Sequence, residues 1–99
     1  MKLRDIAHSR TGDKGNISNI SLIAYEEKYY DFLKEKITPD VVKQQFHDMF
    51  QGEIIRYELP QLSAFNFVIY DALRGGVTRS LSLDSHGKSL SSYLLDIEI

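Results

Sequence analysis

Hydrophobic positions follow a strand-like arrangement in the first quarter of the chain and a helical one directly after it. Residues 17–25 are apolar with few polar interruptions after Ser21, and several are β-branched. Such a run is typical of a central strand that is covered on both faces. From residue 26 onward we expect an amphipathic helix. Its apolar face carries Tyr25, Tyr29, Phe32 and Leu33.

A second helix is predicted to begin sharply at Thr38. The Thr38 hydroxyl suits an N-cap, Pro39 suits the first helical position, and the charge of Asp40 suits the positive end of the helix dipole. Gly52 is placed to end this helix. An apolar stripe with helical spacing, which we interpret as core, consists of Val42, Phe46, Met49 and Phe50.

The second half of the chain is predicted to hold mostly strands. Residues 55–59 alternate between apolar and charged side chains until a proline stops the strand. An apolar run over residues 64–73 and an alternating one over residues 77–84 predict two further strands, which glycines separate. A short helix over residues 88–93 and a closing strand over residues 95–99 complete the order.

This order of elements predicts an α+β fold. We expect a ferredoxin-like sandwich in which two main helices cover one face of a mostly antiparallel sheet. The 99 residues suffice for a single domain, residues 1–99, with one modest core. A hydrophobic content of 42% agrees with a globular chain.

Charge and composition argue against several classes of partner and chemistry. A formal net charge of -2 does not fit the basic surface that nucleic acids require. The chain has no cysteine, so it forms no disulfide and offers no thiolate, and we expect a cytoplasmic protein. No apolar run approaches the roughly 18 residues of a membrane span, and the first ten residues lack the apolar stretch of a signal peptide. We therefore expect neither nucleic acid nor a membrane as partner.

A glycine-rich segment, HSRTGDKGN at residues 8–16, is the first candidate site. Gly12 and Gly15 permit positive φ, so that successive backbone N–H groups converge and form an anion-binding nest. A carboxylate or a phosphate is the expected ligand. The alternative interpretation is a plain loop between two strands, with its charges solvated. The other candidate residues of the segment are Arg10, Thr11, Asp13, Lys14 and Asn16.

A second candidate is the segment RGGVTRS at residues 74–80, which contains Gly75 and Gly76. If its strand phase is continuous, Arg79 points toward the core, where a charge requires a partner. A register break at the glycines would instead let Arg79 reach water. Asn66, between two phenylalanines, also requires hydrogen-bond partners if it is buried. We expect both segments and Asn66 to form one electropositive site for a carboxylate, a phosphate or an acidic side chain of a partner.

The sequence indicates no metal, cofactor or complete catalytic constellation. His8, His47 and His86 lack the spacing of metal ligands. Ser9 beside His8 has no ordered third partner for nucleophilic catalysis. We therefore assign no catalytic residue, no metal ligand and no cofactor.

Four sequence blocks, in order, resemble one known family. They are RTGDKGN at residues 10–16, NF at 66–67, GGVTRSLSLD at 75–84 and GK at 87–88. Together they resemble the ferredoxin-fold domain at the carboxyl end of the acyclic terpene utilisation protein AtuA and its relatives. The resemblance covers residues 6–97. Family members often carry serine at the position of Thr11, which keeps the hydroxyl.

The resemblance implies a non-catalytic accessory or assembly domain. AtuA proteins carry this domain behind a much longer amino-terminal portion, which has no counterpart in these 99 residues. The resemblance therefore implies a small subunit that works with a separately encoded AtuA-type large subunit, and homo-oligomerisation stays open. The alternative is a small enzyme or ligand-binding subunit in terpenoid or acyl-CoA breakdown. In that case Arg10, Lys14 and Arg79 would hold a carboxylate or acyl-CoA, and Asp13 would act as acid or base.

Overall fold

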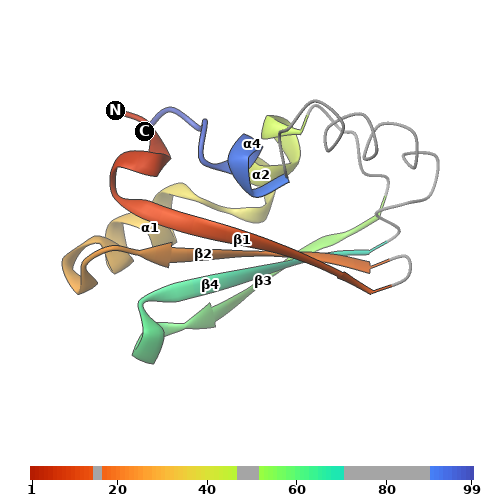
Figure 1. The fold of residues 1–99 in the computed structure, drawn as a ribbon, viewed down its shortest axis with the longest axis horizontal. Helices are drawn as coiled ribbons and strands as arrows, with labels where there is room; N and C mark the ends of the chain where they lie inside the picture. The colour runs from red at the N-terminus through yellow and green to blue at the C-terminus, as the bar shows by residue number, and fades with distance from the viewer. Residues whose placement is uncertain (15–16, 47–51, 71–89) are drawn as a thin grey trace.

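The computed structural model describes residues 1–14, 17–46, 52–70 and 90–99, and Figure 1 shows them. Within this part of the chain, four strands form one sheet in the order β1-β2-β4-β3. Every neighbouring pair is antiparallel. The predicted α+β class with an antiparallel sheet is therefore confirmed. The strands are β1 Ala7–Lys14, β2 Ile17–Ala24, β3 Ile54–Leu59 and β4 Ala64–Ile69.

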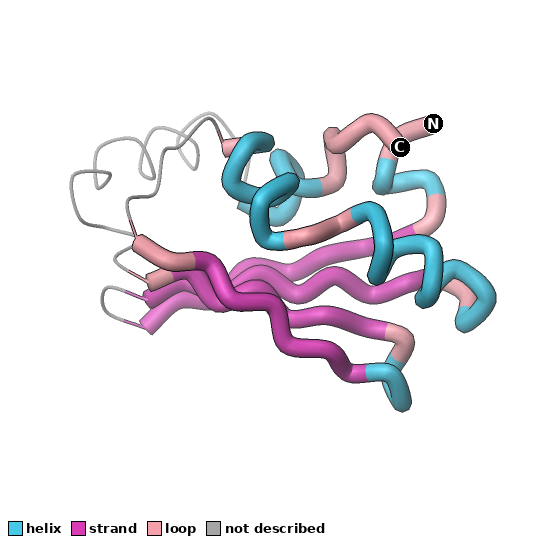
Figure 2. The backbone as a smooth tube through the Cα atoms, turned by 180° about the vertical axis from the view of Figure 1, so that it is seen from behind, coloured by secondary structure: helices cyan, strands magenta, loops and turns pink. Residues whose placement is uncertain are grey.

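The described α-helices lie on one side of the sheet, and no described element covers the other side (Figure 2). They are α1 Tyr30–Lys36, α2 Pro39–Gln45 and α4 Leu90–Leu94. The described part of the chain also forms the short 3-10 helices η1 Leu3–Asp5, η2 Glu27–Tyr29 and η3 Pro60–Leu62. The prediction that helices cover one face of the sheet is confirmed. The predicted strand over residues 77–84 lies outside the described residues.

Strand β2 shows the two-sided character of the sheet most clearly. Its even-numbered side chains, from Ser18 to Ala24, are buried, whereas the odd-numbered ones, from Ile17 to Ile23, are exposed or half-buried. The prediction that this strand is covered on both faces is therefore wrong for the described structure. The alternation follows from an antiparallel sheet with helices on one face only.

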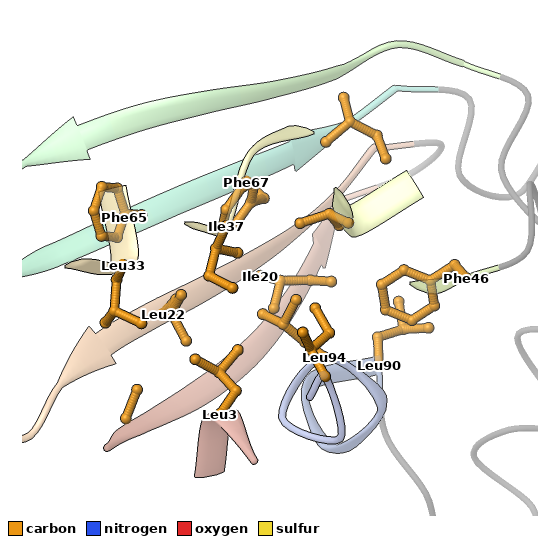
Figure 3. Packing of buried hydrophobic residues seen from close by; sticks show 14 of the residues in the cluster. Leu3, Ile20, Leu22, Leu33, Ile37, Phe46, Phe65, Phe67, Leu90 and Leu94 are labelled. Atoms are coloured by element: carbon orange, nitrogen blue, oxygen red, sulfur yellow. The ribbon is translucent and has the colours of Figure 1, made fainter. Parts of the chain in front are cut away.

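The core fills the space between the sheet and the helix layer (Figure 3). Phe65 and Phe67 on β4 and Ile20 on β2 are fully buried against side chains of the helices. The helices contribute Leu3, Leu33, Val42, Leu90 and Leu94, and the connections add Ile37 and Phe46. All belong to one cluster of buried residues, so the described elements share a single core.

The helix predicted from residue 26 begins instead as the 3-10 turn η2 and becomes α1 only at Tyr30. Leu33 is buried as predicted, but Phe32 is 36% exposed and Tyr25 is 60% exposed. The tighter turn shifts the helical phase, and Tyr30 becomes the residue whose ring stacks on Phe65, with centroids 4.8 Å apart. The predicted apolar face is therefore only partly correct.

The start of α2 agrees with its prediction in detail. The Thr38 hydroxyl accepts a hydrogen bond from the Val41 N–H at 3.2 Å, and Pro39 is the first helical residue. Val42 and Phe46 are buried as expected. The helix is shorter than predicted, since it ends at Gln45 rather than near Gly52. Met49 and Phe50 lie outside the described residues.

Strand β3 lies close to its predicted bounds, but its apolar side faces away from the core. The Arg56 side chain points to the helix layer and donates to the carbonyls of Lys34 and Ile37, at 2.6 and 2.9 Å. These carbonyls lie at the end of α1, where helical carbonyls lack partners. The guanidinium also lies 5.3 Å from the Phe65 ring. Tyr57, on the opposite face, is consequently 48% exposed.

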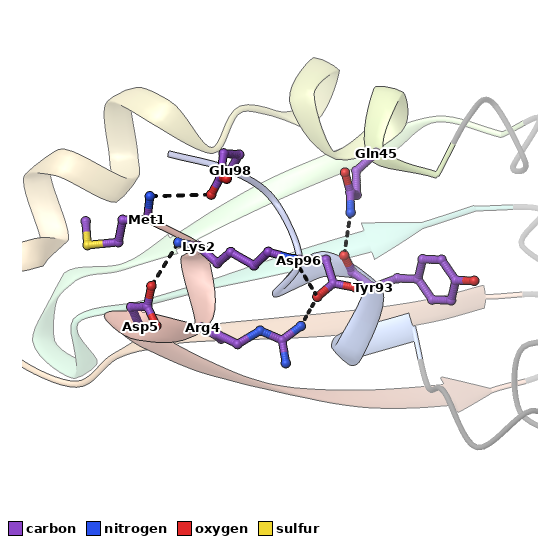
Figure 4. Close-up of polar contacts among 8 residues, drawn as sticks. All are labelled: Met1, Lys2, Arg4, Asp5, Gln45, Tyr93, Asp96 and Glu98. Atoms are coloured by element: carbon purple, nitrogen blue, oxygen red, sulfur yellow. Dashed lines mark hydrogen bonds and ion pairs between the residues drawn. The ribbon is translucent and has the colours of Figure 1, made fainter.

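The predicted closing strand over residues 95–99 does not join the sheet. This segment instead pairs with the N-terminus: the Leu3 N–H donates to Ile97 and the Ile99 N–H donates to Met1, both at 2.8 Å. The Met1 amino group and Glu98 form an ion pair at 3.4 Å, and Arg4 pairs with Asp96 (Figure 4). The two termini therefore hold each other beside η1, and the predicted short helix is confirmed over α4.

We expect Phe46→Ala to destabilise the domain by about 3–5 kcal/mol, because it would leave a cavity where helices α2 and α4 meet. Phe46 is only 1% exposed, and its ring lies 6.3 Å from that of Tyr93. The free energy of unfolding is measured by urea titration. The exposed Phe32→Ala serves as the matched control, and an unchanged midpoint for Phe46→Ala would show that the side chain is not in the core.

Candidate functional site

The glycine-rich segment that the sequence singled out lies largely in β1. This strand runs as far as Lys14, so the segment from Arg10 to Lys14 is extended and pairs residue by residue with β2. Backbone N–H groups alternate in direction along a strand. The predicted anion-binding nest is therefore wrong for residues 10–14. Gly15, Asn16, Gly75, Gly76 and Arg79 lie outside the described residues.

Thr11 faces the helix layer and fixes α4 to the sheet. Its hydroxyl accepts a hydrogen bond from the Ser91 N–H at 2.9 Å. Ser91 is the second residue of α4, and the first N–H groups of a helix lack partners within the helix. The hydroxyl that the sequence suggested for ligand binding therefore has a structural role.

Gly12 gives the Asn19 side chain room on the neighbouring strand. The two residues are directly paired between β1 and β2. A Cβ atom at Gly12 would lie 3.2 Å from Asn19 Oδ1, closer than most such contacts. The Gly12 carbonyl also accepts a hydrogen bond from the Ser18 hydroxyl at 3.2 Å. A close approach between two strands thus explains this glycine.

Arg10 and Asn66 lie on the same face of the sheet, in one row that crosses all four strands. The register pairs Arg10 with Ser21, Ser21 with Asn66, and Asn66 with Tyr57. Arg10 and Asn66 are two strands apart, which corresponds to about 9–10 Å between their backbones. The Ser21 hydroxyl accepts from the Arg10 N–H at 3.1 Å. Sequence reasoning missed Ser21 and Tyr57, because only the strand register brings them into this row.

This row crosses the uncovered side of the sheet, which we call the open face. The open face combines apolar side chains with few charges. Tyr57, Ile17 and Leu59 are 48%, 39% and 37% exposed. From β1 to β3, its side chains are His8, Arg10, Gly12, Ile17, Asn19, Ser21, Ile23, Ala64, Asn66, Val68, Ile55, Tyr57 and Leu59.

Tyr70 follows β4 at the rim of the open face and interacts with Tyr57. Electrostatic repulsion from Tyr57 is the main cause that raises the pKa of Tyr70 above 10.0. Desolvation, a side-chain hydrogen bond with Tyr57 and the charge of Glu53 act in the same direction. Tyr70 is therefore neutral at physiological pH and adds apolar surface to the face.

The connection from β1 to β2 and the chain that leads from β4 toward the second candidate segment start from one end of the sheet. Strand β1 ends at Lys14, which pairs with Ile17, and β4 ends at Ile69, which pairs with Ser18. The connection from β1 to β2 and the chain that follows Tyr70 therefore begin at the same end of the sheet (Figure 1). We call it the glycine end.

The described residues include no group of three or more His, Cys, Asp or Glu side chains that could hold a metal ion. None of the described helices is long and apolar enough to cross a membrane.

Comparison with known proteins identifies the family. The family described as AtuA ferredoxin-like domain matches residues 1–99. The chain belongs to the AtuA ferredoxin-like domain family. No curated protein and no solved structure matches it. The match confirms the resemblance drawn from the four sequence blocks and the ferredoxin-like fold class.

In this AtuA ferredoxin-like domain, we expect Thr11→Val to lower the free energy of unfolding by about 0.5–2 kcal/mol. The substitution keeps the shape of the side chain but leaves the Ser91 N–H without its acceptor. Thr11→Ser retains the hydroxyl and serves as the matched control. Urea unfolding of the three proteins measures the difference. A loss of stability in Thr11→Ser but not in Thr11→Val would mean that the methyl group, not the hydrogen bond, holds α4.

Proposed function

We propose that this chain is a non-catalytic accessory domain that assembles with a larger AtuA-type protein. The match of the AtuA ferredoxin-like domain to the whole of residues 1–99 carries the proposal. The resemblance described above implies that AtuA carries this domain together with a much larger portion. An accessory domain of this family acts by contact with that larger portion rather than by chemistry of its own.

The glycine end is the contact that we propose for the larger protein. Strand β1 ends at Lys14 there, and Arg10 and Asn66 lie further along the sheet. The chain that follows Tyr70, in whose sequence Arg79 stands, begins at this end, which supports the proposal. An arginine or lysine that meets an acidic side chain in a desolvated contact forms charge-assisted hydrogen bonds. We therefore expect an acidic patch on the larger protein.

A carboxylate ligand is a different use of the same cations. Acyl-CoA carries phosphates, which these residues would also attract. The experiment therefore includes acyl-CoA and inorganic phosphate as separate titrants, beside the larger protein.

The double variant Lys14→Ala/Arg79→Ala tests the contact. Removal of a partner from a desolvated charge pair costs about 2–5 kcal/mol. We therefore expect the Kd for the larger AtuA-type protein of the same organism to rise by about thirtyfold or more. Isothermal titration calorimetry with purified full-length proteins measures the Kd. Arg10 is left unchanged because it lies on the open face.

The matched control is Lys28→Ala/Lys34→Ala, which removes two charges from the η2 and α1 region. We expect this control to bind as the wild type does. Absence of binding between the wild-type proteins would contradict the accessory role. Binding that is equal in both double variants would contradict the glycine end as the contact. Binding of acyl-CoA or phosphate alone would favour a ligand site.

A further inference from the structure

The open face has the composition of a surface that another protein covers. Its apolar residues run across three adjacent strands, from Ile23 on β2 to Tyr57 on β3. The basic groups of the face, Arg10 and His8, lie on β1. The uncharged Ser21 and Asn66 lie between Arg10 and Tyr57 in the central row. One edge of the face is thus basic and the other edge is apolar and aromatic.

This distribution makes the face complementary to itself. Stacked sheets pack about 10 Å apart with their strands nearly aligned. A two-fold axis that lies between two sheets and runs along their strands places β1 of one copy over β3 of the other. Because such a rotation keeps the position along the strand, each cross-strand row meets the same row in reverse order. The central row then places Arg10 over the Tyr57 ring of the second copy, a favourable cation–π arrangement.

In the rows on either side of the central one, large side chains of one copy lie over small residues of the other. In the row His8, Ile23, Ala64, Leu59, the rotation places the large Ile23 over the small Ala64 of the second copy. In the row on the other side, Gly12 lies opposite Ile55 of the second copy. Alternation of large and small side chains lets two surfaces interdigitate.

A dimer with its two-fold axis perpendicular to the strands is less favourable than one with the axis parallel to them. A two-fold axis across the strands would place β1 over β1 and bring the two Arg10 side chains toward each other. Like charges at the edge of an apolar interface repel each other in a low dielectric. The axis along the strands is therefore the one that the charges favour.

The size of the face fits a weak dimer. Four strands of at least six residues cover roughly 19 by 20 Å, or about 400 Å² in flat projection per copy. The relief of the side chains and Tyr70, at the rim, add to this area. Two copies would bury about 800 Å² in flat projection, which is below the range of about 1,200–2,000 Å² of stable interfaces.

We propose that the open face binds a second copy of this chain, about a two-fold axis parallel to the strands, with Arg10 of each copy on Tyr57 of the other. This contact covers the open face, which meets the glycine end at Ile17, and it does not depend on the larger AtuA-type protein. The dimer would leave the glycine ends of both copies at the periphery of the sandwich.

Substitutions that change the charges at positions 10 and 57 test both the dimer and its orientation. We expect the wild-type chain to dimerise in sedimentation equilibrium. Tyr57→Lys places a second cation opposite Arg10 at two symmetric positions, so the dimer Kd should rise roughly a hundredfold or more. The double variant Arg10→Glu/Tyr57→Lys restores opposite charges across the interface. Its Kd should return to within about tenfold of the wild-type value.

The control is Phe32→Lys, which places the same charge on an exposed aromatic position of the helix layer. It should dimerise as the wild type does. Circular dichroism checks the fold of each variant, and if Tyr57→Lys does not fold, Tyr57→Glu should dimerise and Arg10→Glu/Tyr57→Glu should not. A wild-type chain that stays monomeric at all concentrations would overturn the proposal. Dimerisation that Tyr57→Lys leaves unchanged, or that the double variant does not restore, would overturn the proposed orientation.

Discussion

Burial of the helix-facing side chains on the two central strands is the interaction on which the described structure depends. Phe65, Phe67 and Ile20 are fully buried, and each described α-helix contributes to the same cluster. Removal of apolar surface from water is the dominant stabilising term in a small domain. Because side chains alternate along a strand, the register that buries these residues also determines the open face. The strand register therefore determines both the core and the proposed interface.

Local features of the fold could be predicted from the sequence. Thr38 and Pro39 determine the start of α2 through contacts within one turn, and a proline ends β3. The errors concern contacts between distant residues. Arg56 faces the core side because it finds carbonyls at the end of α1, more than fifteen residues earlier. The segment after α4 pairs with the N-terminus rather than with the sheet. Alternation predicts a strand but does not indicate which of its faces is buried.

In the candidate site, too, the sequence indicates residues that matter but not their distant partners. The Thr11 hydroxyl was predicted to contact a ligand, and it accepts a hydrogen bond from the Ser91 N–H. Gly12 was predicted to adopt a positive φ, but it lies in the extended strand β1 and gives room to Asn19. The bond to Ser91 joins residues 80 positions apart, which no local pattern reveals. The strand register brings Arg10 and Asn66 into one row, and their membership of one binding site stays a prediction. The contribution of Gly75, Gly76 and Arg79 stays a prediction.

The central claim is that the sheet has one face for the core and one for a second copy of the chain. Isoleucine methyl groups report on both faces, because Ile20 and Ile69 lie on the core side and Ile23 and Ile55 on the open face. The most direct measurement is methyl NMR with a soluble paramagnetic agent, on the wild-type chain and on a monomeric open-face variant. We expect the agent to broaden the open-face methyl signals only in the monomeric variant, and the core-side signals in neither protein. Open-face methyl groups equally accessible in both proteins would contradict the claim.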